Sequence, residues 1–321
     1  MPLVGAHRPH VALYFHAMTI LICGSMAYDT IMVFPDQFKN HILAEQIHIL
    51  NVAFLVPDMR REFGGTAGNI AYTLCQLGGV PRVLAAVGAD GDEYLARLRG
   101  WGASTDLVKR IADTYTAQAI IITDRDNNQI TAFHPGAMQS AHETPVPRGG
   151  DVAIAIIAPD GREAMLQHAA QLAAARVPFI FDPGQGLPMF DGAELARFVD
   201  MATWVAVNDY EGRMLCERTG RSLEALSRSH LGGIVVTLGA EGCDVWEQGE
   251  RRHVPGVGAT EVVDPTGCGD AFRAALLYGL ERGWPLVRCA ELGNRIGAIK
   301  IASRGGQNHV LDVTTLGLEA P

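Results

Sequence analysis

The segment DPTGCGD at residues 264–270 combines two glycines with an aspartate at the start of an expected helix over Asp270–Arg282. Gly267 and Gly269 let the backbone turn tightly, and the helix adds the positive end of its dipole, so the segment is suited to hold an anion. A carboxylate would repel a phosphate there, unless Asp270 accepts the proton of an attacking hydroxyl while the N–H groups hold the transferring phosphoryl. The alternative is that Asp270 caps an ordinary helix.

A second glycine-rich segment, GGTAGN at residues 64–69, precedes an expected helix over Ala67–Leu77. Gly64 and Gly65 allow a ligand to approach the backbone closely. Asn69 carries both donors and an acceptor, which suits sugar hydroxyls. By itself the segment is equally consistent with a glycine-rich helix start and a polar surface residue.

Short apolar runs alternate along the chain with longer helical stretches, and these elements must position the two segments. Runs without polar alternation are typical of strands covered on both faces, and the repetition predicts a parallel, doubly wound α/β sheet flanked by helices. Ligands then gather beyond the carboxyl ends of the strands. The expected strands are residues 20–23, 83–87, 152–157, 178–181, 204–207 and 234–237, and the expected helices are 67–77, 91–101, 162–175, 210–218, 270–282 and 286–303.

Two stretches, about 30–62 and 116–134, break this rhythm and hold strand candidates at 31–34, 47–56, 119–123 and 129–133. The polar link at residues 126–128 is typical of a hairpin turn. We interpret both stretches as a small β-rich lid, although edge strands of the main sheet are equally consistent with the pattern. Residues 1–17 are expected to be a disordered leader, and residues 18–321 to form one domain.

Composition excludes several classes of protein. The 321-residue chain carries a net charge of −9 without a basic cluster, which argues against a nucleic-acid partner. Its six cysteines form no CxxC pair and indicate buried thiols in a reducing compartment. No apolar run reaches the length of a membrane span. We therefore expect a cytoplasmic protein with a small-molecule partner, either monomeric or a homodimer.

The segments GGTAGN and DPTGCGD, in this order and about 200 residues apart, resemble the two signatures of the ribokinase-like (PfkB) kinase family. The stretch from FLVPD (54–58) to REFGG (61–65) is similar to its prokaryotic adenosine- and nucleoside-kinase branch. The resemblance extends from Thr19 to the end of the chain. It implies an α/β domain that binds ATP, a β-lid that closes over the acceptor, and transfer of the γ-phosphoryl to a primary hydroxyl.

The resemblance implies that Asp270 is the catalytic base and that Gly267, Cys268 and Gly269 form the anion hole. Cys268 stands where the family usually has alanine. Both side chains are small and the backbone N–H is the working group, so we expect function to be retained. A nucleophilic Cys268 is an alternative, but no histidine at catalytic spacing supports it.

Asp29, just after the first expected strand, matches the acidic residue with which family members bind sugar hydroxyls. A carboxylate can accept from two adjacent hydroxyls, which distinguishes ribose from deoxyribose. A turn residue is the alternative. Phe34, Phe38, Phe54 and Phe133 could stack on a base, or they could form the lid's own small core.

For the phosphate donor, the resemblance implies contacts from Thr237, Gly239 and Gly242 in the segment TLGAEG, which could equally be a turn into a hairpin. Asn294 is a candidate for the adenine pocket. Arg162 follows a buried strand and could reach the phosphoryl group, although a solvated arginine at a helix start is equally consistent.

Two cation sites are expected. Asn208 and Glu211 resemble the family's Asn-x-x-Glu motif, which organises magnesium, whereas a helix-capping pair is the alternative. Some family members also bind a monovalent cation beside the anion hole. Here Asp264, Thr266 and Ser303 would offer oxygen ligands to potassium, and a plain contact between loops is the alternative.

These expectations combine into ATP- and magnesium-dependent phosphorylation of the 5′-hydroxyl of a purine-type ribonucleoside, such as adenosine, inosine or guanosine, to the 5′-monophosphate. The first alternative is a sugar kinase for ribose, fructose or a related acceptor. The second is a non-catalytic nucleotide-binding module, which the intact Asp270 and the Asn208/Glu211 pair disfavour. A Rossmann dehydrogenase is disfavoured because no GxGxxG follows residues 20–23.

Overall fold

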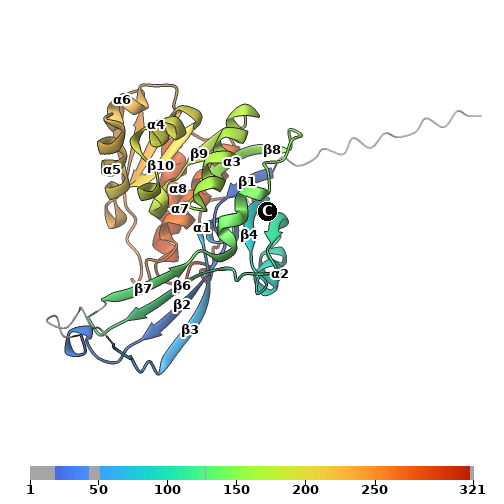
Figure 1. The fold of residues 1–321 in the computed structure, drawn as a ribbon. Helices are drawn as coiled ribbons and strands as arrows, with labels where there is room; N and C mark the ends of the chain where they lie inside the picture. Colours follow the sequence, from blue (N-terminus) through green and yellow to red (C-terminus); the bar gives the residue numbers. More distant parts are fainter. Residues whose placement is uncertain (1–18, 43–50, 127, 319–321) are drawn as a thin grey trace, which may run out of the picture.

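The computed structural model describes residues 19–42, 51–126 and 128–318. Their strands form two separate sheets, one of nine strands and one of four (Figure 1). The expected leader at residues 1–17 lies outside the described residues.

The large sheet has the order β13-β12-β11-β10-β9-β8-β1-β4-β5. Neighbouring strands run parallel from β11 to β5, and β12 and β13 add an antiparallel edge. This confirms the doubly wound, mostly parallel sheet. Its strands are β1 (Thr19–Cys23), β4 (Pro81–Val87), β5 (Ser104–Arg110), β8 (Val152–Ile157), β9 (Phe179–Phe181), β10 (Trp204–Asn208), β11 (Gly233–Thr237), β12 (Gly242–Glu247) and β13 (Glu250–Pro255).

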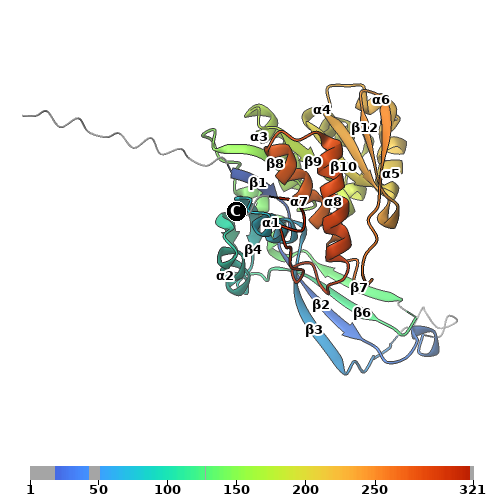
Figure 2. The ribbon, with the colours of Figure 1, turned by 180° about the vertical axis from the view of Figure 1, so that it is seen from behind.

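Helices cover both faces of the large sheet, as the two opposite views show (Figures 1 and 2). One face carries α1, α7 and α8 over one buried apolar cluster, and the other carries α3 to α6 over a second. Strands that are covered on both faces account for the continuous apolar runs in the sequence. The helices are α1 (Thr66–Gln76), α2 (Asp92–Gly100), α3 (Arg162–Ala174), α4 (Gly192–Met201), α5 (Asp209–Thr219), α6 (Leu223–Ser227), α7 (Cys268–Glu281) and α8 (Leu286–Lys300).

The small sheet projects from one end of the large one (Figure 1) and has the order β3-β2-β6-β7. It contains β2 (Ala27–Val33), β3 (Asp58–Gly64), β6 (Ala117–Thr123) and β7 (Gln129–His134), with β2 and β6 parallel and the other pairs antiparallel. The lid interpretation is therefore confirmed against that of edge strands. The strand candidate at 47–56 is wrong over its described part, because residues 51–56 are not in a strand and β3 begins at Asp58.

Three lid aromatics pack on one another at the far end of the small sheet. The ring centroids of Phe34 and Phe54 lie 4.8 Å apart, and those of Phe38 and Phe54 lie 5.1 Å apart. Phe34 and Phe38 are buried. A four-stranded sheet that stands away from the main core needs a core of its own. Phe34, Phe38 and Phe54 pack as such a core, which was one of the two roles expected for the lid aromatics.

Several details differ from the expectations. Strand β5 and helices α4 and α6 were not anticipated, and α8 ends at Lys300 instead of Ser303. All six cysteines are free thiols, and Cys23, Cys243 and Cys289 are fully buried. Among the described residues, no helix is both long enough and apolar enough to cross a membrane.

Candidate active site

Asn69 and Asp270, which are 201 positions apart in the sequence, meet at the junction of α1 and α7. The amide Nδ2 of Asn69 donates to Oδ2 of Asp270 over 2.8 Å. The fold thus joins the two glycine-rich segments into one site, and the carboxylate of Asp270 has a fixed orientation.

The Asn69 side chain is held from its other side as well. Gln307 Nε2 donates to Asn69 Oδ1 over 3.1 Å and also bonds the hydroxyl of Tyr94. Asn69 is only 4% exposed. Asn69 therefore orients the carboxylate of Asp270. Its Nδ2 carries a second N–H group, so the expected contact with a sugar hydroxyl stays a prediction.

Glycines in the first segment allow the close packing that brings α1 to this point. Gly65 has φ = 81°, and a Cβ there would lie 2.6 Å from the backbone N of Ala27 and the carbonyl O of Ser25. A Cβ on Gly68 would lie 1.8 Å from the Tyr94 hydroxyl. These glycines serve the packing of α1 against the β1–β2 turn and α2.

The start of α7 presents backbone N–H groups beside Asp270. Gly267 is the N-cap residue, in the left-handed conformation with φ = 78°, so Asp270 stands in the first turn and the capping alternative for it is wrong. The first N–H groups of a helix have no partner within the helix and favour anions, although that of Cys268 donates to the carbonyl O of Pro265 over 3.2 Å. Burial raises the pKa of the Cys268 thiol, which keeps it protonated and argues against a nucleophilic role.

The carboxyl group of Asp270 has a raised pKa. Burial raises its pKa to about 6, and the negative charges of Asp182 and Asp29 act in the same direction. The hydrogen bond from Asn69 and the charge of Arg273 oppose this rise. A base whose pKa lies just below the working pH is ionised yet still takes up a proton readily.

Asp29 lies on β2 against Gly64 of β3. A Cβ on Gly64 would lie 2.4 Å from Asp29 Oδ2, so glycine is needed to make room for this carboxylate. Burial raises the pKa of Asp29 to about 6, with further contributions from Asp264 and Glu62. The negative charge of Asp29 also raises the pKa of Asp270, so the two carboxylates are close enough to interact electrostatically.

A buried ion pair behind Asp270 was missed by the sequence reasoning. Arg273 on α7 donates from Nε and Nη2 to the two carboxylate oxygens of Asp182, each over 3.1 Å. Its Nη2 also lies 4.0 Å from Glu211 Oε2. Asp182 follows β9 directly, so its place at the carboxyl end of an expected strand was a usable signal.

Asn208 and Glu211 form a capping box at the start of α5. Asn208 Oδ1 accepts from the N–H of Glu211 over 2.7 Å, and Glu211 Oε2 accepts from the N–H of Asn208 over 2.8 Å. The capping alternative is thereby confirmed. Burial raises the pKa of Glu211, so its charge would be favoured by a nearby cation.

Of the residues expected to contact the phosphate donor, some have free backbone or side-chain groups and others are engaged within the protein. Gly239 has φ = 60° and open space above it, which leaves its backbone accessible. A Cβ on Gly242 would lie 2.2 Å from the carbonyl O of Val254, so this glycine serves the β12–β13 hairpin. Thr237 bonds the carbonyl O of Val207, and Asn294 Nδ2 donates to the carbonyl oxygens of Val254 and Pro255 at 3.2 and 3.0 Å.

The recorded hydrogen bonds of the Arg162 side chain do not involve Asp270 or the other expected site residues. Its guanidinium bonds Glu194, at the start of α4, and Glu163, at 3.2 Å. The side chain is 42% exposed and links two helix starts, which agrees with the alternative of a solvated arginine at a helix start.

Lys300 lies between the two segments from which oxygen ligands for potassium were expected. Its Nζ donates to the carbonyl O of Asp264 over 2.9 Å and to that of Ser303 over 3.0 Å. Thr266 contributes an N–H to Asp264 Oδ1 over 2.9 Å. The sequence offered one signal for Lys300, a charge inside the apolar stretch IGAIKIA.

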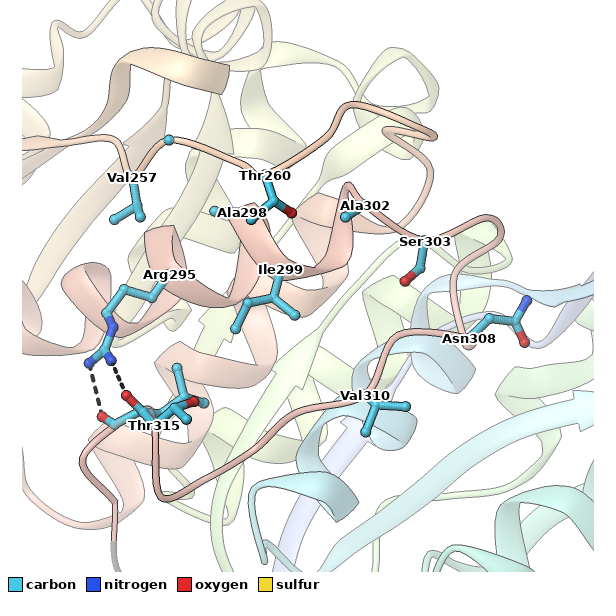
Figure 3. A pocket seen from close by; sticks show the side chains of 12 residues that line it. Val257, Thr260, Arg295, Ala298, Ile299, Ala302, Ser303, Asn308, Val310 and Thr315 are labelled. Atoms are coloured by element: carbon cyan, nitrogen blue, oxygen red, sulfur yellow. Dashed lines mark hydrogen bonds between the residues drawn. The ribbon is translucent and has the colours of Figure 1, made fainter.

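A cavity of about 490 Å³ lies beside α8, between the loop after β13 and the C-terminal segment (Figure 3). Val257, Thr260, Ile299 and Val310 line it. Arg295 points into this region, but its Nη1 and Nη2 are bonded to the carbonyl oxygens of Leu316 and Thr315 at 2.9 and 2.7 Å. Of the expected site residues, Ser303 alone borders the cavity.

Comparison with known proteins decides the family. Residues 26–312 match the family described as pfkB family carbohydrate kinase. The chain belongs to the pfkB family. It is therefore a phosphotransferase that acts on a hydroxyl group, with the ribokinase-like fold expected from its two signatures.

Among individual relatives of this pfkB protein, the nucleoside kinase of Methanothermobacter thermautotrophicus is 28% identical over 91% of this chain and 92% of its own. The solved structure of the Burkholderia thailandensis nucleoside kinase in complex with inosine is 49% identical and covers 91% of this chain and 93% of that one, with a TM-score of 0.82. The same enzyme in complex with ADP-inosine has a TM-score of 0.81 and covers 92% and 93%. The Methanocaldococcus jannaschii nucleoside kinase is 25% identical, covers 94% and 97%, and has a TM-score of 0.85.

Proposed function

We propose that this protein transfers the γ-phosphoryl group of ATP to the 5′-hydroxyl of a purine ribonucleoside. The observation that carries the proposal is the 2.8 Å hydrogen bond between Asn69 and Asp270, which orients a carboxylate of raised pKa in the first turn of α7. Structures of the 49%-identical nucleoside kinase with inosine and with ADP-inosine support a nucleoside as acceptor and an adenine nucleotide as donor.

In this mechanism Asp270 accepts the proton of the 5′-hydroxyl as the oxygen attacks the γ-phosphorus, and the bond from that phosphorus to the bridging oxygen breaks to release ADP. The N–H groups of the first turn of α7 stabilise the negative charge that develops on the phosphoryl oxygens. Because the carboxylate and the amides belong to one helix, their relative position is fixed before the substrate binds. Catalysis then depends on positioning and electrostatics, as in other phosphoryl transfers.

Asn208 and Glu211 are the residues that would hold magnesium. Among the described residues there is no group of three or more His, Cys, Asp or Glu side chains that could bind a metal ion. The available oxygen donors are the Asn208 amide and the Glu211 carboxylate, whose two oxygens accept hydrogen bonds from Asn208. This donor set fits magnesium, which keeps several waters and relies on one or two carboxylates together with substrate phosphates. When bound, the ion would neutralise charge on the phosphate groups.

The acceptor is recognised from the lid. Laterally paired residues of a sheet share a face, and Asp29 pairs with Ala119, which in turn pairs with Phe133. This register places Phe133 on the same face as Asp29, two strands away, or about 10 Å. Its side chain is 53% exposed and thus accessible to a base. Asp29 can accept from the ribose hydroxyls while Phe133 stacks on the base.

The test is ADP release with a panel of nucleosides and sugars, using the wild-type protein and Asp270→Asn. Inosine, guanosine or adenosine should be turned over, and the variant should lose roughly two to four orders of magnitude in kcat because the amide cannot act as a base. Asp113→Asn, an exposed surface change, is the control. Turnover of ribose or fructose without any nucleoside would make the protein a sugar kinase, and an Asp270→Asn rate within a few-fold of wild type would remove Asp270 from the base role.

A further inference from the structure

The side chain of Lys300 is buried at the last turn of α8. The residue is 0% exposed, and its ammonium donates to two backbone carbonyl oxygens, those of Asp264 and Ser303. Removing an ammonium from water costs several kcal/mol unless its new partners compensate. The two carbonyl groups compensate the buried ammonium at the place where two loops meet.

These two loops carry the machinery of the site. Asp264 begins the segment that leads to Gly267–Gly269, and its carboxylate accepts from the N–H of Thr266 at 2.9 Å and from the N–H of Gly305 at 2.8 Å. A Cβ on Gly267 would lie 2.9 Å from Gly306 Cα, so the loops are in direct contact. A shift of the C-terminal loop would be passed directly to the anion-binding turn.

The charges around Lys300 also belong to the site. Burial lowers the pKa of Lys300, whereas the neighbouring Cys268, Asp264 and Asp270 favour its charged form. The ammonium thus interacts electrostatically with Asp264 and Asp270, the two ends of the anion-binding segment. Neutralising it would change the field at the anion hole as well as the packing of the two loops.

We propose that Lys300 is a built-in monovalent cation that fixes the anion-binding loop, so that turnover needs no added potassium. A lysine ammonium and a potassium ion carry the same charge, and both bind carbonyl oxygens. Here the chain supplies the cation covalently, at the carbonyl groups of Asp264 and Ser303. Lys300 acts on the reaction through the loop and is a positioning residue.

This inference rests on phosphoryl transfer at the proposed site, but it does not depend on which hydroxyl compound is the acceptor. If the wild-type protein turns over no nucleoside, the proposed acceptor is refuted, and the cation measurements are made with the compound of the panel that is turned over. Failure of the two ideas is therefore distinguishable.

The first measurement compares the wild-type rate in potassium chloride and in tetramethylammonium chloride at constant ionic strength. The rates should agree within about twofold. The second measurement uses Lys300→Met, which keeps most of the side-chain length and removes the charge. Its kcat should fall roughly 10- to 100-fold, because small misplacements of catalytic groups have effects of that size. Added potassium or ammonium should restore part of this loss.

Lys109→Met is the matched control, because Lys109 lies on the surface in an ion pair with Glu143. It should leave both the rate and the cation response unchanged. Lys300→Gln provides a second variant should Lys300→Met fail to fold. Potassium activation of the wild-type enzyme would overturn the inference. So would a folded Lys300 variant with an unchanged rate, or one whose lost activity no small cation restores.

Discussion

At the scale of single residues, the reactivity of Asp270 depends on its immediate neighbours. Burial raises its pKa to about 6, and the amide of Asn69 opposes that rise by donating to the ionised carboxylate. Since only the ionised form can act as a base, the rate should decline as the pH falls through about 6.

Replacing Asn69 by alanine should move this acidic limb of the pH–rate profile to higher pH. A hydrogen bond to a charged group is worth about 1.5–3 kcal/mol, which corresponds to a shift of about one to two pH units. The measurement is kcat against pH between roughly 5 and 9. Asn40→Ala, an exposed change in the lid, should leave the limb in place. A profile of Asn69→Ala that coincides with that of the wild type would show that Asn69 does not tune the base.

Asp29→Asn should weaken binding of the acceptor and leave binding of the donor nearly unchanged. Loss of about 1.5–3 kcal/mol would raise the KM for the nucleoside roughly 10- to 150-fold. The variant should also lose the preference of the wild type for inosine over 2′-deoxyinosine. Equal turnover of the two compounds by the wild type would contradict the assignment of Asp29 to the ribose hydroxyls, and Asp58→Asn on β3 is the control.

At the scale of elements, the buried pair of Arg273 and Asp182 joins α7 to the end of β9. This contact fixes the helix that carries both the anion-binding amides and Asp270. Arg273→Met would leave the Asp182 carboxylate buried without its partner, and removal of one member of a buried pair costs about 3–5 kcal/mol.

The free energy of unfolding of Arg273→Met, measured with urea, should fall by that amount. The exposed pair of Arg213 and Asp209 offers a matched control, since Arg213→Met should cost less than about 1 kcal/mol. The double variant Asp182→Asn/Arg273→Met should recover part of the loss. A change in Arg273→Met no larger than that of the control would show that the pair does not stabilise α7.

At the scale of the whole molecule, the proposed site is divided between two parts of the fold. Asp270 stands at the start of α7, which covers the large sheet, whereas Asp29 and Phe133 lie on β2 and β7 of the lid (Figure 1). Movement of the lid toward the large sheet would bring these groups together and exclude water from the reacting phosphoryl group.

Phe133→Ala should raise the KM for inosine roughly 5- to 150-fold, because stacking of a base on an aromatic ring is worth about 1–3 kcal/mol. The matched control is Ile130→Ala. Ile130 is similarly exposed, at 41%, but lies on the opposite face of β7, since it is an odd number of positions away. Equal effects of the two substitutions would place the base elsewhere.

The sequence by itself determined the alternation of strands and helices and the family, and it identified Asp270 as the candidate base. Runs such as residues 152–157 could be recognised because strands covered on both faces are continuously apolar. The two glycine-rich segments could be recognised because tight backbone turns require glycine at fixed spacings. Both signals are local, so they can be read without knowledge of the fold.

Only the tertiary structure decided which side chains work together. Asn69 was expected to bind sugar, and the structure also shows it bonded to Asp270. Gln307 gave no signal at all, and the charge of Lys300 in an apolar stretch did not show its partner. The partners of Arg273 and Lys300 are Asp182 and Asp264. The physical reason is that a buried polar group needs a partner in space, and these partners lie 36 to 238 positions away in the sequence, where no local pattern connects them.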